Sequence, residues 1–466
     1  MRSPDGRVMS ETRRLARFTA ETAAGQIPDP ALDRARMSLL DAVAVMLAAS
    51  GSGEGCDAFV DVARISGSGP CAVIGHDFRT SPAMAAFANG AMAHAMDFED
   101  THDHAIAHPH AAAIAAALAI VDTKPGTSGD DLLAAIAIAG DLVCRIAGSF
   151  DVNPDTFGWH TTPWLGVFGA ATAAGRLLAL DADRMIDAWS LAMSQMASFG
   201  ELKNAPNSHV RAVRDAFAAQ AGVLGAMLSA RGVKGYDEPL QGGAGFFASV
   251  ARGRYTAARL VDDLGTRLQG AEVSFKPWPC CRGTHAYVDA GLRLASRMRI
   301  DPERIRRIDV VVNEKNRMLC EPRPSKVRPD TAINAKFSIP FTTATALLRG
   351  AVGIASFSQV ALRDEGILSL AARVHHTVDP DIPLRDVTRG SVTLHIDDAR
   401  VSEHVVLALG HPLQPMTLGA FRAKFDDCTR HARCPFDDDG RDRLWDALCT
   451  IRSNADVAGL TTLLQG

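Results

Sequence analysis

The stretch DFEDTHDHAIAHPH, residues 97–110, places four histidines and four acidic residues within fourteen positions. Such side chains can bind a metal ion, line an anion pocket or belong to a polar loop. His102 and His104 have H-x-H spacing, and His104 and His108 have H-x-x-x-H spacing, either of which could supply two zinc ligands. Neither an H-E-x-x-H motif nor a cysteine ligand set accompanies them. Pro109 would start a helix, whose N-terminus attracts carboxylates, so all three interpretations stay open.

A second group of reactive side chains occurs in FKPWPCCRGTH, residues 275–285, which combines Lys276, Arg282 and His285. Its prolines fix the backbone, so the basic groups should be held at set positions. The adjacent cysteine pair invites a metal or redox interpretation. Neighbouring residues point different ways in regular structure, however, and a strained vicinal disulfide is uncommon in a reduced cell. We therefore expect two buried thiols.

Helical periodicity dominates the first half of the chain and should position these residues. Asp29 is a good N-cap with Pro30 at the first helical position, and leucines follow at helical spacing. Alanine-rich segments continue the pattern, and because alanine lets helices approach closely, they predict a compact bundle. Further helices are expected at residues 82–96, 110–121, 132–146 and 169–178.

Strand periodicity begins after about residue 270. Apolar and polar residues alternate at 308–313, which predicts a strand, and the segment at 392–409 predicts a β-hairpin. Between them, residues 331–350 predict a helix with an irregular start around Pro340. Helical patterns return after Pro412.

A chain of 466 residues exceeds the roughly 250–300 at which single cores stop growing, so two domains are expected. We predict a mainly α fold: a large helical domain at 1–269, a smaller inserted α+β lid domain at 270–410, and C-terminal helices at 411–466 that return to the first domain. The glycine-rich QGGAGFF, residues 241–247, follows no buried strand and precedes no G-K-[ST]. It predicts a tight turn between helices instead of a phosphate loop.

The composition is that of an ordinary globular protein and argues against several partners. A net charge of -4 and an aromatic content of 6% give no case for binding nucleic acid or an anionic membrane. The N-terminus lacks the apolar core of a signal peptide, and the apolar run at 105–121 does not qualify as a membrane span. Nine scattered cysteines without a C-x-x-C pair fit a reduced, cytoplasmic compartment.

Five motifs, in order along nearly the whole chain, resemble the MmgE/PrpD family. They are MDFEDTHDHAIAHPH, ELKNAPNSHVRAVRDAFAAQAGVLGAML, GGAGFF, FKPWPCCRGTHAYVDA and NAKFSIPF. Members include 2-methylcitrate dehydratase, cis-aconitate decarboxylase and iminodisuccinate epimerase. The resemblance implies a large all-helical domain with a smaller α+β lid, usually as a homodimer. It also implies chemistry on small polycarboxylates without a metal or organic cofactor.

The resemblance also assigns candidate catalytic residues. Asp97, Thr101 and His108 match the family's D-x-x-x-T and following H-P positions. His160, in FGWHTTP, matches a second active-site histidine, and His285 matches the histidine that closes a C-x-x-x-H motif. The histidines without an assigned counterpart are His102, His104 and His110.

A polycarboxylate must be held by cations and helix ends, and the candidates are Thr101, Arg211, Lys276 and Arg282. Two positions depart from the family pattern. Arg211 stands where the family commonly has a lysine; it keeps the positive charge but cannot donate a proton at neutral pH. Phe341 stands where the family often has a tyrosine and offers no hydroxyl. Both departures weigh more against a decarboxylase than against polycarboxylate chemistry in general.

The leading hypothesis is a cofactor-independent hydro-lyase that dehydrates a 2-methylcitrate-like hydroxy-tricarboxylate. His108 and His160 would form the acid–base pair, supported by His285, because imidazole titrates near neutral pH. Asp97 would orient one imidazole. The alternatives within the family are a cis-aconitate-type decarboxylase and an iminodisuccinate-type epimerase. Outside it, they are a zinc-dependent hydrolase built on the histidine cluster and a non-catalytic carboxylate-binding protein.

Overall fold

The computed structural model describes residues 9–205 and 208–465. The chain divides into two compact units. The first comprises Met1–Ala95, Ala107–Glu272 and Cys428–Gly466, and the second comprises Met96–Ile106 and Val273–Asp427. The sequence placed boundaries after residues 269 and 410, without the short segment Met96–Ile106. The histidine-rich stretch is thus shared between the two units.

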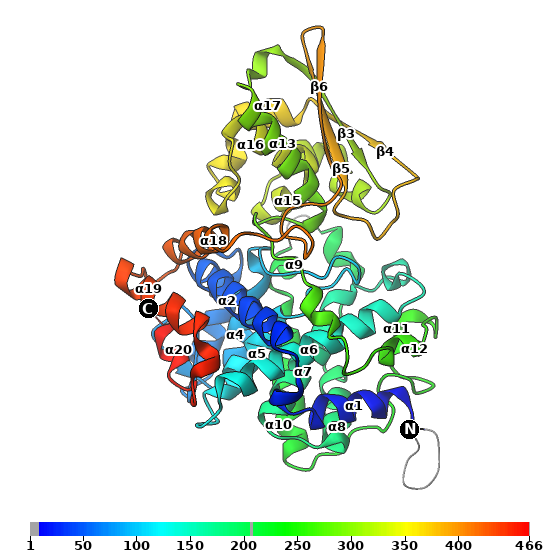
Figure 1. Ribbon diagram of the computed structural model, residues 1–466, viewed down its shortest axis with the longest axis vertical. Helices are drawn as coiled ribbons and strands as arrows, with labels where there is room; N and C mark the ends of the chain where they lie inside the picture. Colours follow the sequence, from blue (N-terminus) through cyan, green and yellow to red (C-terminus); the bar gives the residue numbers. More distant parts are fainter. Residues whose placement is uncertain (1–8, 206–207, 466) are drawn as a thin grey trace. The chain divides into compact units, whose positions relative to one another are not determined.

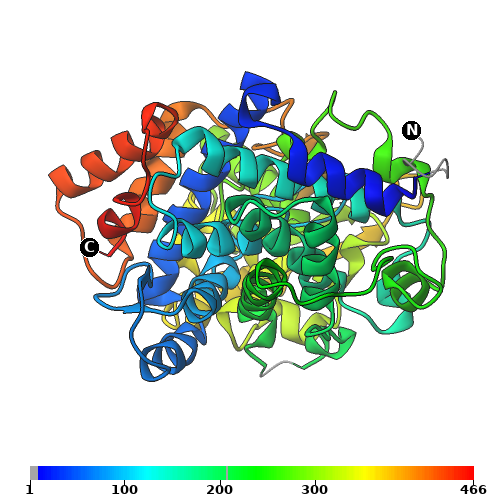
Figure 2. The ribbon, with the colours of Figure 1, turned by 90° about the horizontal axis from the view of Figure 1, so that it is seen from below.

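The first unit is built almost entirely of helices (Figures 1 and 2). The longer ones are α1 (Glu11–Glu21), α2 (Asp29–Ser52), α3 (Cys56–Ile65), α4 (Pro82–Ala95), α5 (Ala111–Val121), α6 (Gly129–Ser149), α7 (Thr161–Leu177), α8 (Ala182–Met193), α10 (Asp215–Ala230) and α19 (Asp438–Cys449). Shorter elements are α9 (Val210–Val213), α11 (Phe246–Ala251), α12 (Ala258–Val261), α20 (Leu460–Leu463) and the strand pair β1 (Cys71–Ala72) and β2 (Arg79–Thr80). The prediction of a mainly α fold is confirmed.

Helix α5 forms the centre of this unit's core. All of its residues are buried, and its sequence AAAIAAALAIV is mostly alanine. Short side chains allow close packing, and α4, α6, α7 and α10 all pack against it. His110 precedes α5 and lies so close to Gly140 of α6 that a Cβ at Gly140 would come within 2.2 Å of the ring Nε2. The start of α5 is therefore fixed against α6.

Two helices of this unit, α2 and α6, are long and apolar enough to cross a membrane by length and composition alone. The apolar window of α2 is 78% buried and that of α6 is 94% buried inside the protein. The interior of a helical bundle requires helices of this kind, because an apolar surface must pack against another element. The α2 helix begins at Asp29 itself with Pro28 as N-cap, one residue before the predicted start.

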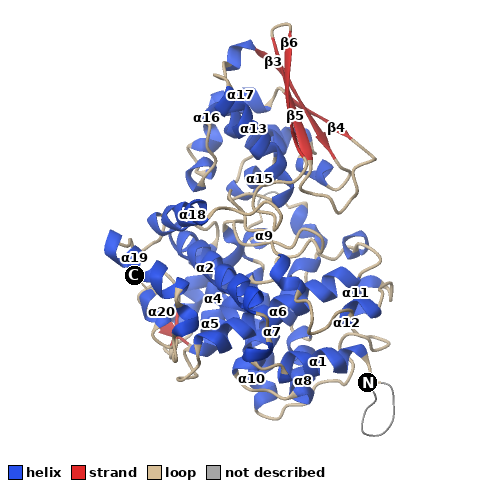
Figure 3. Ribbon diagram, in the orientation of Figure 1, coloured by secondary structure: helices blue, strands red, loops and turns tan. Residues whose placement is uncertain are grey.

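The second unit combines short helices with a four-stranded sheet, drawn red in Figure 3. The strands are β3 (Ile305–Val312), β4 (Val374–Val378), β5 (Gly390–Ile396) and β6 (Ala399–Val405), in the order β4-β3-β5-β6. The helices are α13 (His285–Arg297), α14 (Arg323–Val327), α15 (Ala332–Lys336), α16 (Ile339–Arg349) and α17 (Glu365–Ala371). Helix α18 (Leu418–Arg430) spans the boundary after Asp427.

Strand β3 lies in the interior of the sheet, parallel to β4 and antiparallel to β5, and β5 and β6 form the predicted hairpin. Helix α13 packs against β5 and β6. Its Tyr287 hydroxyl donates to the Val311 carbonyl at 2.9 Å, and a Cβ at Gly390 would lie 2.7 Å from the Tyr287 ring. The absence of a side chain at Gly390 thus lets α13 sit close to the sheet.

The predicted helix at residues 331–350 is two helices, α15 and α16, separated at residues 337–338. The side chain of Ser338 caps α16 by accepting from the Phe341 amide at 3.0 Å, and Pro340 lies in the first turn. In the first unit, the expected glycine-rich turn precedes α11, where the Gly242 amide donates to the Glu238 carbonyl at 3.0 Å.

Candidate functional site

Four helix ends meet in the first unit and bring polar side chains together. His94 lies in the last turn of α4, and His108 lies three residues before α5. His160 is the N-cap of α7, and Arg214 directly precedes α10, which begins at Asp215. Helices α4, α5 and α7 each pack against α10. We call the group His94, His108, His160, Arg214 and Asp215 the helix-end cluster.

Contacts within the helix-end cluster join residues that are distant in sequence. The rings of His94 and His108 meet edge to face with centroids 5.2 Å apart. The His94 Nδ1 lies 3.8 Å from the Asp215 Oδ2, and both side chains are almost fully buried. A Cβ at Gly166 of α7 would lie 3.7 Å from the Asp215 Oδ1, so α7 approaches the start of α10 closely. The N-termini of α7 and α10 add positive potential here.

His160 is buried, and its imidazole is uncharged at neutral pH. Its side chain has only 8% exposure, and neither ring nitrogen has a hydrogen-bond partner among the described residues. Burial lowers the pKa of His160 well below 6.5, and the positive charges of Arg214, Lys203 and Arg211 lower it further. A neutral imidazole with unused hydrogen-bonding capacity, surrounded by cations, is suited to proton transfer on an anionic substrate.

Arg214 is a site residue that sequence reasoning missed. It is 4% exposed, its Nη1 donates to the Arg211 carbonyl at 3.0 Å, and its Nε has no hydrogen-bond partner among residues 9–205 and 208–465. It lines a cavity of about 310 Å³ together with Ser198, whose carbonyl accepts from the His160 amide at 3.0 Å. The only sequence signal was its position one helical turn after Arg211. His94, within AMAHAM, was also missed, because its sequence surroundings do not mark it as a site residue.

Asp97 has a strained backbone that a buried lysine holds in place. Its φ is +48°, which is uncommon for a residue other than glycine. Lys276, fully buried, donates to the Asp97 Oδ1 at 2.7 Å and to the Asp97 carbonyl at 2.9 Å. Burial alone would lower the pKa of Lys276, but the negative charges of Asp97 and Glu99 raise it above its ordinary value. The lysine is therefore charged and ion-paired.

Lysines bind three consecutive carbonyls of this segment in the second unit. The Lys336 Nζ donates to Met96 at 2.9 Å, Lys276 donates to Asp97, and the Lys424 Nζ donates to Phe98 at 2.7 Å. All three lysines are buried. A few residues on, Thr101 forms an antiparallel bridge with Ser274 through two amide–carbonyl bonds of 2.9 and 2.7 Å. These bonds fix the segment 96–101 to the rest of its unit.

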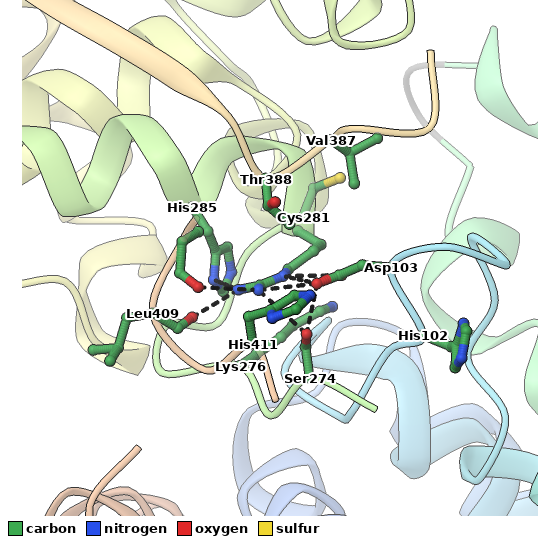
Figure 4. A network of polar contacts seen from close by, with 12 residues as sticks. His102, Asp103, Ser274, Lys276, Cys281, His285, Val387, Thr388, Leu409 and His411 are labelled. Atoms are coloured by element: carbon green, nitrogen blue, oxygen red, sulfur yellow. Dashed lines mark hydrogen bonds and ion pairs between the residues drawn. The ribbon is translucent and has the colours of Figure 1, made fainter. Parts of the chain in front are cut away.

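Arg282 uses all of its N–H groups on protein partners, and Figure 4 labels Asp103, Ser274, His285 and Leu409 among these partners. Its Nε and Nη2 contact the Asp103 carboxylate at 3.1 Å each, and its Nη1 donates to the Leu409 carbonyl at 2.8 Å. Further bonds reach Ser274, Ala408 and His285. A guanidinium has five N–H groups, so Arg282 would have to give up a bond to bind a substrate carboxylate. Its predicted role in substrate binding stays a prediction.

His285 has a partner on each ring nitrogen. Its Nδ1 lies 3.3 Å from the Arg282 Nη1, which can only donate, and its Nε2 lies 3.1 Å from the Cys280 carbonyl, which can only accept. This pattern assigns a neutral ring with the proton on Nε2. Burial lowers the pKa of His285 well below 6.5, and Arg282 and Lys276 lower it further. His285 is thus better placed to position Arg282 than to exchange protons.

The remaining histidines of the 97–110 stretch have structural contacts. The His102 Nδ1 accepts from the Ala105 amide at 3.0 Å, His104 is exposed, and His110 is buried against Gly140. Of the two ring nitrogens of His102 that could bind zinc, Nδ1 is already used to accept the Ala105 amide within the loop. The polar-loop interpretation fits His102 and His104 better.

The structure places the predicted site residues in two groups. His108, His160 and Arg211 lie in the first unit, whereas Asp97, Thr101, Lys276, Arg282 and His285 lie in the second. Within each unit the predicted residues are drawn together from distant parts of the chain. Phe341 is fully buried in the second unit, 6.2 Å from the ring of Phe357.

Acid should destabilise the protein through buried neutral histidines, among them His160 and His285. In the unfolded chain each imidazole titrates near 6.5, but in the folded protein the pKa values of His160 and His285 are well below this. As the pH falls through about 6.5 the unfolded state therefore binds more protons. The free energy of unfolding should fall with a slope that approaches about 1.4 kcal/mol per pH unit for each histidine.

Denaturant titrations between about pH 7.5 and pH 5.5 test this pH dependence. Over this range the variant H285N should lose about 1.4 kcal/mol less stability than the wild type, because asparagine does not titrate. A variant slope equal to that of the wild type would contradict the prediction.

Comparison with known proteins adds to this geometry. Residues 13–258 match the family model of the MmgE/PrpD N-terminal domain, and residues 278–441 match that of the MmgE/PrpD C-terminal domain. The chain is 27% identical to the cis-aconitate decarboxylase-like protein oryM of Aspergillus oryzae, over 100% of this chain and 98% of that protein. It is 26% identical to a cis-aconitate decarboxylase of Aspergillus terreus (86% and 85% covered) and 25% identical to the human cis-aconitate decarboxylase (84% and 81% covered).

Proposed function

The chain belongs to the MmgE/PrpD family, and from this premise we propose that it releases carbon dioxide from a small, unsaturated polycarboxylate of the cis-aconitate type. The family resemblance predicted from five motifs is confirmed, and the chain is an enzyme of lyase type. The sequence favoured dehydration of a 2-methylcitrate-like acid. Relatives named as cis-aconitate decarboxylases instead support the alternative hypothesis, a cis-aconitate-type decarboxylase.

The observation that carries the proposal is the environment of His160. A neutral, buried imidazole lies among the cations Arg214, Arg211 and Lys203. Carboxylates are attracted to such cations and to helix N-termini, and α7 and α10 both begin at this place. The helix-end cluster therefore supplies both substrate-binding charge and a group that can move a proton.

Decarboxylation needs electrons to be accepted and then a proton to be delivered. The bond between a carboxylate carbon and its neighbour breaks, carbon dioxide leaves, and the electron pair stays on the neighbouring carbon. There it is delocalised through the alkene onto an adjacent carboxylate, and fixed positive charge stabilises this intermediate. One proton then forms a C–H bond, so each turnover consumes one proton and releases one carbon dioxide.

Substrate binding lets His160 take up that proton from solvent. In the free protein, burial and nearby cations keep the imidazole neutral. A bound polyanion pairs with these cations and adds negative charge beside the ring, which raises the pKa of His160 so that it takes up a proton from solvent. The imidazolium then donates this proton to the carbanion carbon. His108, which meets His94 in the same cluster, is our second proton-transfer candidate.

Several finer assignments remain proposals. We propose that Thr101 and Lys276 contribute to substrate binding, that Asp97 acts with a histidine, and that the second unit serves as a lid. We also propose a homodimer in the cytoplasm, acting without metal or organic cofactor. Light scattering and elemental analysis of the purified protein test the oligomeric state and the metal content.

The proposal is tested by incubating the purified protein with cis-aconitate, 2-methylcitrate or iminodisuccinate in deuterium oxide. We expect cis-aconitate or a close analogue to release carbon dioxide. The product should carry one deuterium, seen by NMR, on the carbon that receives the proton. Loss of water from 2-methylcitrate without carbon dioxide would restore the dehydratase hypothesis. Deuterium exchange in iminodisuccinate without either loss would favour an epimerase.

A further inference from the structure

The cavity beside His160 has walls that a tricarboxylate alone would not use. It has a volume of about 310 Å³ and lies within the first unit, and its size is near the lower end of small-ligand pockets. Eight of the lining residues are apolar: Pro163, Met196, Ala197, Phe199, Leu202, Ala205, Val210 and Phe217. The polar lining consists of Ser198, Glu201, Ser208 and Arg214.

The charges of this cavity fit a single anionic group. Arg214 is its one lining cation, 4% exposed, with an Nε that has no hydrogen-bond partner among the described residues. Because a buried N–H without a partner is costly, a ligand oxygen at Arg214 would be favoured. The exposed Glu201 carboxylate also lines the cavity and would repel a second anionic group. The part of the ligand that lies along the cavity wall away from Arg214 must therefore be uncharged, and any further carboxylates must lie outside this cavity.

The apolar walls are unusually open to solvent. Phe199 is 61% exposed, Val210 is 45% exposed and Phe217 is 43% exposed. The Phe199 ring stacks on Trp159, the residue next to His160, with centroids 5.8 Å apart. An alkyl chain beside these side chains would remove apolar surface from water on both partners. The apolar wall of the cavity thus begins at Phe199, whose ring contacts the residue before His160, the proposed proton-transfer group.

We propose that this cavity binds the alkyl limb of an alkyl-substituted polycarboxylate, with one carboxylate on Arg214 and the reacting carbon beside His160. The inference rests on the proposed function and names its substrate class: an unsaturated polycarboxylate with a hydrocarbon substituent. The alkyl limb contacts Met196, Val210 and Phe217. A longer limb therefore binds more tightly, because each buried methylene adds favourable transfer free energy.

A homologous series tests the proposal. The substrates are cis-aconitate and its methyl, propyl and pentyl derivatives, substituted on the methylene carbon. With the wild-type protein, kcat/KM should rise about fourfold for each added methylene until the cavity is filled. In V210D the rise should disappear, because a carboxylate then faces the hydrocarbon chain. Unsubstituted cis-aconitate turning over as fast as the pentyl derivative would overturn the inference while leaving the proposed decarboxylation intact.

The matched control is V360D, which places the same charge on a valine that is 83% exposed and does not line the cavity. It should keep the wild-type dependence on chain length. If V360D loses it as well, the effect of V210D is not specific to the cavity and the inference fails.

A binding experiment separates the inference from the proposed function. Acetate and hexanoate are titrated into the wild type and V210D and followed by NMR. Hexanoate should bind the wild type at least about tenfold more tightly than acetate, and this preference should vanish in V210D. If no substrate releases carbon dioxide while the preference holds, the proposed function fails and the ligand chemistry of the cavity stands. If hexanoate gains nothing and V210D turns a dimer into a monomer, the apolar face is a subunit interface and the inference is overturned.

Discussion

The variant H160N should turn over substrate about 10²- to 10⁴-fold more slowly than the wild type, the range attributed to general acid–base catalysis. Asparagine keeps a polar side chain of similar reach but cannot take up and deliver a proton. KM should change less than kcat, because the carboxylate-binding cation Arg214 remains. Steady-state kinetics over a range of pH measures both values, and the limb of the pH profile assigned to the histidine should vanish.

His76 supplies a matched control for this prediction. It is a histidine of the same unit, 3% exposed, and burial lowers its pKa to about 4. It follows the two-residue strand β1 and is no member of the helix-end cluster. H76N should therefore keep near-wild-type kcat. H76N and H160N should each lower the free energy of unfolding by about 1 kcal/mol, so that the two variants differ in activity and not in stability. Equal losses of kcat in both variants would remove His160 from its proposed role.

Much of the helical unit could be predicted because its helices are long and locally encoded. The alanine-rich segment at 110–121 predicted α5 to within one residue, since composition and periodicity agree there. Strand β4, with the sequence VHHTV, was missed. Two of its residues are exposed, and its pairing partner β3 lies more than sixty residues earlier in the chain. Parallel pairing at that distance leaves no local signature.

The candidate site shows a similar limit. Motifs located His160 and His285, but the two side chains differ in a way that only tertiary structure determines. The ring nitrogens of His285 are occupied by Arg282 and the Cys280 carbonyl, whereas those of His160 have no partner among the described residues. Arg282, predicted as a substrate ligand, binds carbonyls about 126 residues away. Arg214, which directly precedes α10, belongs to the candidate site because α7 packs against α10.

Lys276 should be the most costly buried lysine to replace. In K276M the Asp97 carboxylate loses its buried counter-ion, and removing one partner of such a pair costs about 3–5 kcal/mol. The strained Asp97 backbone also loses the bond to its carbonyl. We expect the free energy of unfolding, measured by denaturant titration, to fall by this amount. The double variant K276M/D97N should recover most of it, because no uncompensated charge remains.

Lys326 separates loss of the ion pair from loss of any buried lysine. It lies in the same unit, is 9% exposed, and its Nζ donates to the Phe337 carbonyl at 2.8 Å. K326M removes an ammonium that donates to a backbone carbonyl and should cost about 1–3 kcal/mol. Activity should separate the two variants further, since of these two lysines Lys276 is the one that donates to Asp97. If K326M and K276M lose equal stability and D97N restores nothing, the Lys276–Asp97 pair does not hold the segment at 96–101 as its contacts indicate.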